Sequence, residues 1–402
     1  MSQNMSPDII VDHCPVRRIS PADGRHYFFG YFDKFPYDKS GRRLLGNRID
    51  FTARQPEVGE TSTLGWFDLT DNCRFHPFAE TLAWNWQQGS MLQFLNDADD
   101  LVIYNDREDD HFVARIFNLA TGKLERTLHR PIYCLSPDGR WALSVNFSRL
   151  DRERPGYGYN GAYDPFAGEL TPENDGIWLI DLKQDTSTLI FSLAAAKERF
   201  YRSDMEHTQA WFNHLLFSPD SKRFGTLHRW RLWEPDGEPT HGTHMYTGNI
   251  DGSDLWPLNT EGFSSHYTWI SPTQIINYSR RFDFEKQYYL YTDRSHRTEV
   301  IAKDVFPGDG HCAYSPDGKW MMTDSYPLKV DNTRRLFLYH LASRTAYEVG
   351  KFYADPAYPI PTRCDLHPNW SRDGRKLCID SIHEGFRGIY EVDVSSLTGG
   401  ER

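Results

Sequence analysis

The sequence of 402 residues has few cysteines, no excess of basic residues and no long apolar segment. Its six cysteines include no Cys-x-x-Cys pair, and this scatter favours free thiols or one metal ligand over a disulfide framework. The 45 Lys and Arg against 56 Asp and Glu give a net charge of −11. Nucleic acid is therefore not expected as a partner, because it needs a broad basic surface. No run of about 18 apolar residues exists, so we expect no membrane-spanning helix.

The N-terminal segment also lacks the apolar core of a secretory signal. As written, the chain is expected to be cytoplasmic, or periplasmic or secreted if a signal had been trimmed. Hydrophobic residues form 39% and charged residues 25% of the chain, which is typical of a globular protein. Aromatic residues reach 15%, a content that suits a β-rich protein and a sugar-binding surface.

A short pattern recurs along the whole chain: an apolar run, a Pro/Asp/Gly turn and an alternating apolar run. This pattern is the signature of a β-hairpin. The five clear copies are CLSPDGRWALSV (134–145), LFSPDSKRFGTL (216–227), WISPTQIINY (269–278), AYSPDGKWMMTD (313–324) and NWSRDGRKLCID (369–380). Two degenerate copies precede them, FPYDKSGRRLLGN (35–47) and QFLNDADDLVIYN (93–105).

Seven hairpins, each followed by a further strand-like segment, predict an all-β fold. A repeat of about 40–60 residues with three or four strands is typical of a β-propeller. We therefore predict one domain over 1–402, a seven-bladed β-propeller. Little chain remains after the last hairpin, so residues within about 8–20 are expected to complete the last blade and close the ring. Two insertions are expected, a glycine-rich loop at about 149–174 and a helical segment at about 192–207.

Four histidines stand at the same register, just before the turns of the last four hairpins. They are His214, His266, His311 and His367. A single histidine at such a position more often satisfies backbone groups, but four in register favour a function. Imidazoles that converge on one face can bind a metal or move protons near neutral pH. Arginines at the ends of the returning strands suit carboxylates or sulfates.

Cys364, Asp365 and His367 lie together in TRCDLHPNW. Thiolate and imidazole ligands suit zinc, and manganese less well. We predict a divalent metal, zinc before manganese, bound by His311, Cys364 and His367, with His266 or Asp365 as a fourth partner. The alternative is a buried thiol beside a structural histidine. No organic cofactor is expected.

The segment RPGYGYNGAY at 154–163 lies in a long loop that leaves the same face. Loops of this length commonly bind or cover something. Tyr157 or Tyr159 could stack on a sugar or serve as an acid, or these rings could simply fasten the loop to the propeller.

Several of these segments together resemble the propeller polysaccharide lyases, namely the oligogalacturonate lyases and the related ulvan lyases. The likeness covers about 26–394 and is strongest in AWNWQQG and CDLHPNWSRDG. The resemblance implies cleavage of uronic-acid-containing glycans by β-elimination. For oligogalacturonate lyases it implies a metal held by histidines and a glutamine, with His311 and His367 at matching ligand positions and His266 at the position of the base. Ulvan lyases are similar in carrying a structural zinc, with His, Tyr and Arg performing the chemistry.

Elimination explains the residue types on this face. The proton α to a uronate carboxylate becomes acidic when the carboxylate charge is neutralised, and a base and an acid then complete the reaction. We expect His214 or His266 as base, Tyr157 or Tyr159 as acid, and Arg229 with Gln88 at the carboxylate; His111 or His228 is the next candidate base. The expected partner is an anionic oligo- or polysaccharide. Its further contacts are expected to be Arg107, Arg130, His228 and Trp230.

Two other classes of function stay open. A propeller glycoside hydrolase needs two carboxylates that flank the bond, and the face offers Asp33, Asp106, Asp324 and Glu384. A non-catalytic propeller that binds a protein or peptide is the third possibility. It predicts apolar or variable rims rather than converging histidines.

Overall fold

The computed structural model describes residues 9–95, 100–281 and 285–399. Its strands form seven sheets; in six of them four consecutive strands form the core, and in the seventh three consecutive strands are joined by one from the N-terminus. The fold class is thus a seven-bladed β-propeller, as the hairpin count predicts. The chain divides into two compact units, and one domain over 1–402 stays a prediction. Among the described residues, no helix is long and apolar enough to cross a membrane.

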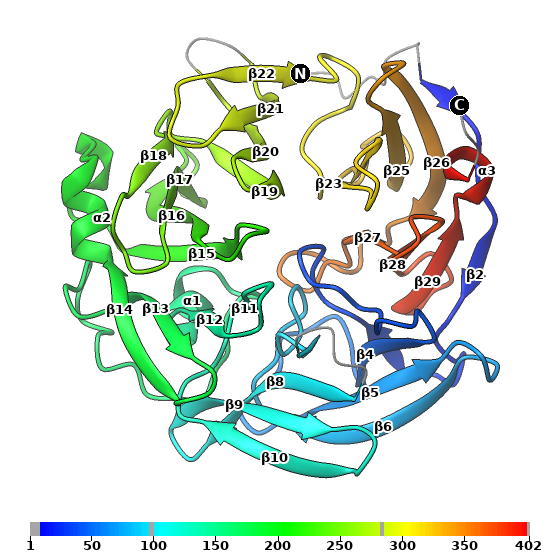
Figure 1. The fold of residues 1–402 in the computed structure, drawn as a ribbon, viewed down its shortest axis with the longest axis horizontal. Coiled ribbons are helices and arrows are strands. Elements are labelled where there is room, and N and C mark those ends of the chain that lie inside the picture. The colour runs from blue at the N-terminus through cyan, green and yellow to red at the C-terminus, as the bar shows by residue number, and fades with distance from the viewer. Residues whose placement is uncertain (1–8, 96–99, 282–284, 400–402) are drawn as a thin grey trace. The chain divides into compact units, whose positions relative to one another are not determined.

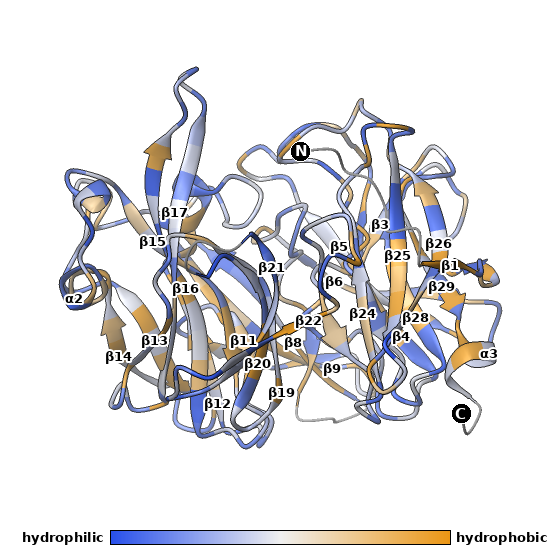
Figure 2. Cartoon of the chain, turned by 90° about the horizontal axis from the view of Figure 1, so that it is seen from above, coloured by the Kyte–Doolittle hydropathy of each residue, from blue (hydrophilic) through white to orange (hydrophobic). Residues whose placement is uncertain are grey.

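The first unit comprises 1–104, 116–125 and 302–402. Three of its sheets lie wholly within it. Their core strands are β3 (His26–Phe28), β4 (Arg43–Ile49), β5 (Ser62–Asp68), β6 (Arg74–Thr81), then β23 (Ala313–Tyr314), β24 (Trp320–Asp324), β25 (Thr333–His340), β26 (Thr345–Tyr353), and β27 (Asn369–Trp370), β28 (Lys376–Ser381), β29 (Gly388–Asp393). A short helix, α3 (Ser395–Thr398), follows the last strand. In Figure 2, β25 is hydrophilic at its first end and hydrophobic in its middle.

The second unit comprises 105–115 and 126–301. Its three sheets contain β11 (Cys134–Leu135), β12 (Trp141–Ser144), β13 (Gly176–Asp181), β14 (Thr186–Ser192), then β15 (Ala210–Phe217), β16 (Arg223–Trp233), β17 (Pro239–Asn249), β18 (Trp256–Asn259), and β19 (Ser264–Ser271), β20 (Gln274–Ser279), β21 (Gln287–Thr292), β22 (Thr298–Ile301). The seventh sheet has residues in both units and consists of β7 (Gln93–Phe94), β8 (Leu101–Glu108), β9 (His111–Asn118) and β10 (Lys123–Leu128).

The predicted insertions both lie in the second unit. The segment at 192–207 is helical as predicted, with α2 (Leu193–Arg199) and a short 3-10 helix, η1 (Ser203–Met205). The segment at 149–174 differs from the expected loop, because it begins inside a helix, α1 (Phe147–Glu153). The side chain of Asn146 caps this helix by accepting a hydrogen bond from the backbone N–H of Arg149.

The recurring turn has a common hydrogen-bond pattern, which explains its sequence. In the turn at Ser315, the serine hydroxyl donates to Oδ1 of Asp317 at 2.6 Å and accepts from the backbone N–H of Trp320 at 3.0 Å. Gly318 has φ +69°, a conformation that glycine adopts without strain. The same serine and aspartate pairing occurs at 136/138, 218/220 and 371/373.

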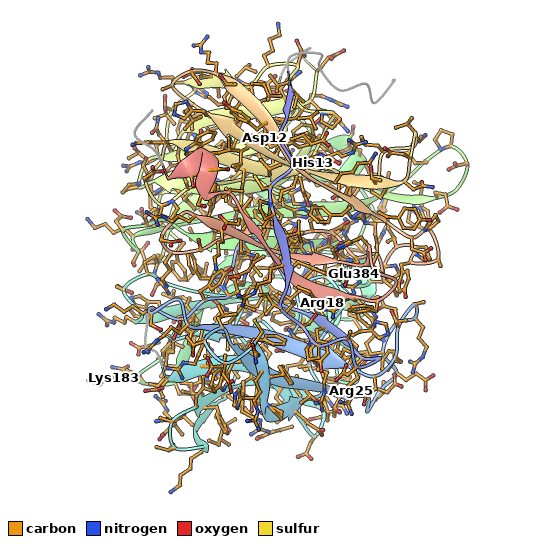
Figure 3. The ribbon with its side chains drawn as sticks, turned by 90° about the vertical axis from the view of Figure 1, so that its right-hand side faces the viewer. Asp12, His13, Arg18, Arg25, Lys183 and Glu384 are labelled. Atoms are coloured by element: carbon orange, nitrogen blue, oxygen red, sulfur yellow. The ribbon has the colours of Figure 1, made fainter. Side chains whose placement is uncertain are left out.

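The N-terminal segment completes the C-terminal blade, as predicted. The strand β2 (Val16–Arg18) pairs antiparallel with β29, and Figure 1 shows the blue strand beside the red one. The shorter β1 (Ile10–Val11) does not join that blade but pairs parallel with β26 as a fifth strand of its sheet. Figure 3 shows the segment along these strands, with Nη1 of Arg18 at 2.9 Å from Oε2 of Glu384.

Just after β2, Ile19 enters the hydrophobic core that contains Tyr27, Leu64 and Ile389. We predict that Ile19→Ala lowers the free energy of unfolding by about 2–4 kcal/mol, the usual cost of emptying a buried aliphatic site. Val11→Ala is the matched control, because Val11 is 62% exposed whereas Ile19 is 3% exposed. Chemical denaturation measures both variants; equal losses would mean that this segment does not fasten the blade through Ile19.

Candidate functional site

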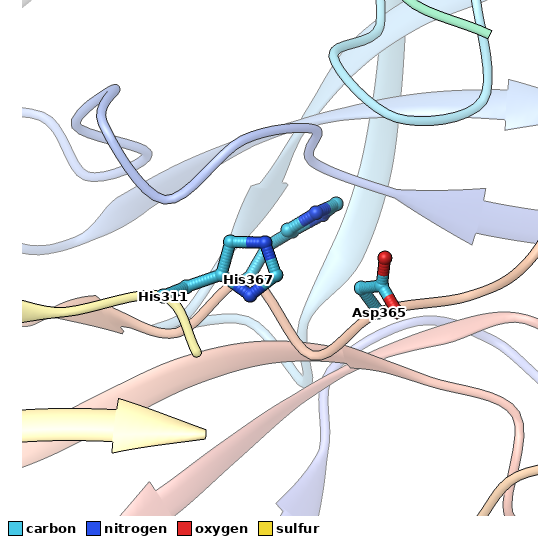
Figure 4. Close-up of side chains that lie close together, drawn as sticks. All are labelled: His311, Asp365 and His367. Carbon is cyan, nitrogen blue, oxygen red and sulfur yellow. The ribbon is translucent and has the colours of Figure 1, made fainter. Parts of the chain in front are cut away.

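Three buried side chains of the first unit lie together as a candidate metal centre. The ligand atoms of His311, Asp365 and His367 all lie within 4.8 Å of one another, and each residue is at most 3% exposed. The two imidazoles meet edge to face, with ring centroids 4.5 Å apart, and Figure 4 shows the carboxylate beside them. Sequence analysis predicts both histidines here, with Asp365 as a further partner.

A second carboxylate orients His311. Its Nδ1 lies 2.9 and 3.0 Å from the two carboxylate oxygens of Asp324, whose Oδ1 also accepts the backbone N–H of His311 at 2.7 Å. When Nδ1 carries the proton toward Asp324, Nε2 is the nitrogen that can act as a ligand. A carboxylate behind a metal-binding histidine is the usual way in which proteins fix the tautomer and raise the basicity of the ligand.

Two arginines hold Asp365. Arg363 donates from Nε and Nη2 to the two carboxylate oxygens, both at 2.7 Å, and Arg334 donates from Nη2 to Oδ1 at 2.8 Å. Burial alone would raise the pKa of Asp365, but Arg363 first and Arg334 second hold it well below its usual range. Each carboxylate oxygen has two lone pairs, so the ionised group can accept these bonds and still face a cation.

Cys364 does not belong to this cluster. Arg363 and Asp365 pair with each other and so share one side of the chain, which directs the side chain between them away. The sulfur of Cys364 lies near the carbonyl oxygen of Asp365, at 3.9 Å, and burial raises the pKa of the thiol to about 11. Asp365, expected as a fourth partner, therefore takes the third place. All six cysteines are free.

The donor set of two imidazoles and a carboxylate fits a divalent cation. Its aligned second carboxylate and its burial match the chemistry of such centres. With an oxygen donor in place of the sulfur, however, the set no longer prefers zinc over manganese, because that preference depended on a soft thiolate.

In the second unit, the two other histidines of the register also lie close together. The ring of His214 has its centroid 5.9 Å from that of His266 and 6.0 Å from that of Tyr157. All three side chains are at most 6% exposed. The structure therefore places His214 beside both the other candidate base, His266, and one of the two candidate acids, Tyr157.

The backbone at His214 is strained. Its φ is +52°, and the register of β15 against β16 shifts between Asn213 and Leu216. The hydroxyl of Tyr133 accepts the N–H of His214 at 3.0 Å, and the hydroxyl of Tyr267 donates to its carbonyl at 2.5 Å. Such a conformation persists only where the surroundings enforce it, which is common at functional sites. His367 shares this feature, with φ +42°.

A group of cations surrounds His241, and sequence analysis identified only Arg229 among them. The pKa of His241 is well below its usual value because of burial first, and then because of Arg229, Arg154, Arg231 and Lys286. Arg154 also lies over the ring of Tyr157, at 5.1 Å. The alternation Arg-x-Arg in β16, with His241 opposite Arg231 in β17, could have shown that these residues share a face.

Tyr159 lies in a different environment from Tyr157. It is 1% exposed and stacks on Phe147 of α1 with ring centroids 4.5 Å apart. Its hydroxyl accepts a hydrogen bond from Asn105 at 3.1 Å, and burial raises its pKa well above the usual range. Gly158 lets the loop approach α1 closely, because a Cβ there would lie 2.0 Å from the backbone N of Asp151. Tyr159 is thus placed as a fastener of the loop.

His228 and Trp230 lie on the opposite face of β16 from Arg229, since side chains alternate along a strand. Both are 0% exposed. They pack with His244 and Tyr246 of β17. The hydroxyl of Tyr246 donates to the carbonyl of Ala196 in α2. The structure does not bring these two predicted substrate contacts together with Arg229.

The other predicted substrate contacts are dispersed. Gln88 is buried in the first unit, where its backbone N–H donates to Oδ1 of Asn85 at 2.7 Å. Arg107 stands near the end of β8 and is partly buried. Arg130 lies over the ring of Trp178 at 3.9 Å and lines a cavity of about 390 Å³ that His111 also lines.

The metal centre yields a first prediction. We expect Cys364→Ser to keep one bound divalent ion, whereas Asp324→Asn should weaken binding about 10–100-fold through loss of the histidine's orienting partner. Asp365→Ala should weaken binding at least as much. Isothermal titration with Mn²⁺ and Zn²⁺ measures the three affinities. A loss of binding in Cys364→Ser, with Asp365→Ala unaffected, would restore the thiol as the third ligand.

The buried position of His228 yields a second prediction. Burial first and His244 second lower its pKa from 6.5 to about 3, so the unfolded chain takes up this proton at a higher pH than the folded protein. Stability linked to His228 is therefore full above about pH 6.5 and is lost as the pH falls toward 3. We expect His228→Leu to flatten the fall in melting temperature between pH 7 and 4. The exposed His111→Leu is the control, and the same slope in both variants would contradict the assignment.

Comparison with known proteins gives the fold a context. No family model and no curated protein matches the sequence. Among solved structures, an oligogalacturonate lyase from Vibrio parahaemolyticus matches with a TM-score of 0.67 at 16% identity, over 98% of this chain and 97% of that chain. An oligogalacturonate lyase in complex with manganese matches with a TM-score of 0.65 at 15% identity, over 97% and 96%. A puromycin-hydrolyzing peptidase of Mycobacterium tuberculosis also matches, with a TM-score of 0.55 at 11% identity, over 96% of this chain and 55% of that chain. The predicted resemblance to oligogalacturonate lyases is confirmed at the level of the fold.

Proposed function

We propose that the protein is a lyase that cleaves uronic-acid-containing oligo- or polysaccharides by β-elimination. The observation that carries the proposal is the cluster in the second unit, where His214 lies beside His266 and Tyr157 and Arg154 lies over the ring of Tyr157. These types are the base, acid and charge-neutralising groups that the reaction needs. The near-full-length likeness to two oligogalacturonate lyases supports the same class of reaction.

The cations bind the substrate and neutralise its charge. Arg229, Arg154 and Arg231 bind the uronate carboxylate, and their positive charge lowers the energy of the carbanion-like state that forms next to it. Glu153 is the acidic partner of Arg231, with Oε2 at 3.2 Å from Nη2. His241 stays neutral because its pKa is lowered, so it contributes a hydrogen bond rather than another charge.

The two histidines and the tyrosine carry the protons. His214 or His266 removes the proton from the carbon α to the carboxylate. Tyr157 donates a proton to the 4-linked oxygen as its bond to the sugar breaks, which leaves an unsaturated uronate at the new end. Tyr157 is preferred over Tyr159, because the hydroxyl of Tyr159 is engaged with Asn105 and its ring is buried against α1.

His311, Asp365 and His367 hold a divalent cation in this proposal, manganese or zinc. When bound, such an ion supplies positive charge that stabilises a carboxylate or the oxygen of an enolate. The manganese in one of the solved oligogalacturonate lyases supports this assignment. Asp324 keeps His311 in the ligand tautomer, and Arg363 keeps Asp365 ionised.

The glycoside hydrolase is less well supported. It needs one carboxyl group that stays protonated to serve as acid, but each carboxylate considered for that role faces a cation or an imidazole. Asp33 pairs with Lys34, Asp106 with Arg115, Asp324 with His311 and Glu384 with Arg18. Buried converging histidines likewise do not fit a rim that only binds a protein.

The test is an assay for the ultraviolet absorbance of the unsaturated product on a panel of uronate glycans. His214→Ala and His266→Ala are expected to include one variant whose rate falls by about 10²–10⁴, the contribution of a general base. Tyr157→Phe should lower the rate strongly, whereas Tyr159→Phe keeps the ring stack on α1 and should retain near wild-type activity.

Melting temperatures measured in parallel separate catalysis from folding. Reducing-end release without the unsaturated product would indicate hydrolysis instead. Wild-type rates in folded His214→Ala and His266→Ala would remove both histidines as bases, and His241 would then be examined with His111 and His228.

A further inference from the structure

A cavity of about 220 Å³ lies in the first unit, beside the segment that carries the candidate metal ligands. Its lining includes Arg334, Arg363, Cys364, Ala354, Tyr358 and Ile382. All these residues belong to β25, to the segment after β26 or to the end of β28 and the turn after it. The candidate metal ligands His311, Asp365 and His367 are not among the residues that line it.

Arg334 lines this cavity and carries a donor that no described residue accepts. The residue is 2% exposed. Its Nε donates to the carbonyl of Cys364 at 2.8 Å and its Nη2 to Asp365, but its Nη1 is buried and has no hydrogen-bond partner among the described residues. A buried guanidinium N–H without a partner is costly and is found mainly where a ligand or water completes it.

We propose that this cavity binds a small carboxylate monoanion through Nη1 of Arg334. A carboxylate matches a guanidinium donor in charge and in geometry. The walls formed by Ala354, Ile382 and the neighbouring prolines suit the apolar part of such a molecule, and the volume admits a ligand up to about the size of one sugar ring. Asp355 also lines the cavity, and its negative charge favours a monoanion over a polyanion.

Arg334 links this cavity to the metal centre. The same guanidinium holds Asp365 through Nη2, so an anion at Nη1 offsets part of the positive charge that Asp365 experiences. Asp365 then becomes a stronger ligand for a cation. We expect the anion and the divalent ion to bind cooperatively, each raising the affinity for the other by the same factor. This coupling rests on the metal centre of the proposed function, whereas the anion site does not.

The test is a titration of the metal-depleted protein with sodium acetate and with sodium galacturonate, at constant ionic strength set by sodium chloride. Galactose is the neutral control. Both carboxylates should give saturable heat and raise the melting temperature, whereas galactose and chloride should not. Ala354→Leu fills the cavity and should weaken binding about tenfold or more. Ala357→Leu, an exposed neighbour outside the lining, should bind as the wild type does.

Arg334→Lys is the second variant, because it keeps the positive charge but removes the planar guanidinium donors. It tests the anion site if Ala354→Leu does not fold. Binding of galacturonate without acetate would still support the site and would assign it to a uronic acid. No carboxylate binding above chloride, or unchanged binding in both cavity variants, would overturn the proposal. Because no lyase assay enters the titration, a negative result leaves the proposed reaction standing, and a failed lyase assay leaves the anion site standing.

Discussion

The hydrogen bonds inside the hairpin turns set the position of three of the candidate histidines. In four of the five clear repeats, the serine hydroxyl bridges the aspartate side chain and a backbone N–H on the next strand, which fixes where the hairpin turns. His214, His311 and His367 each precede the turn serine by four residues. Because an extended residue advances about 3.3 Å, the same offset brings each imidazole to the corresponding end of its blade. The repeated turn therefore fixes the positions of these imidazoles as well as those of the strands.

Charge burial explains why the candidate metal centre needs so many partners. A carboxylate buried beside two imidazoles is unfavourable unless ion pairs and hydrogen bonds replace its water. Arg363 and Arg334 supply them to Asp365, and Asp324 supplies the matching negative charge to His311. The centre is thus a network of alternating charges in which a divalent cation adds to the positive side. Removal of one member leaves a buried charge without its partner, so these residues are expected to act as a group.

The fold follows from the sequence far more directly than the site does. The sequence contains seven turn motifs and too little chain after the last one for an outer strand. These features predict the seven blades and the contribution of β2 to the last blade. The site depends on which way each side chain points. Cys364 and Asp365 are adjacent, and only the pairing of Arg363 with Asp365 decides which of them faces the histidines. Likewise, Arg229 and Trp230 are neighbours on opposite faces of β16, a distinction that the alternation of a strand predicts once its pairing with β17 is known.

Positive charge buried in an acidic protein is the feature that most needs an explanation outside the fold. The chain has a net charge of −11, yet Arg229 and Arg334 are 3% and 2% exposed. Arg154, Arg229, Arg231 and Lys286 all act on His241, which answers by staying neutral rather than by adding a fifth charge. Packing alone would favour apolar residues at such positions. In the proposed reaction, a uronate adds its negative charge beside these cations, at the atom next to the carbon that the proposed base attacks.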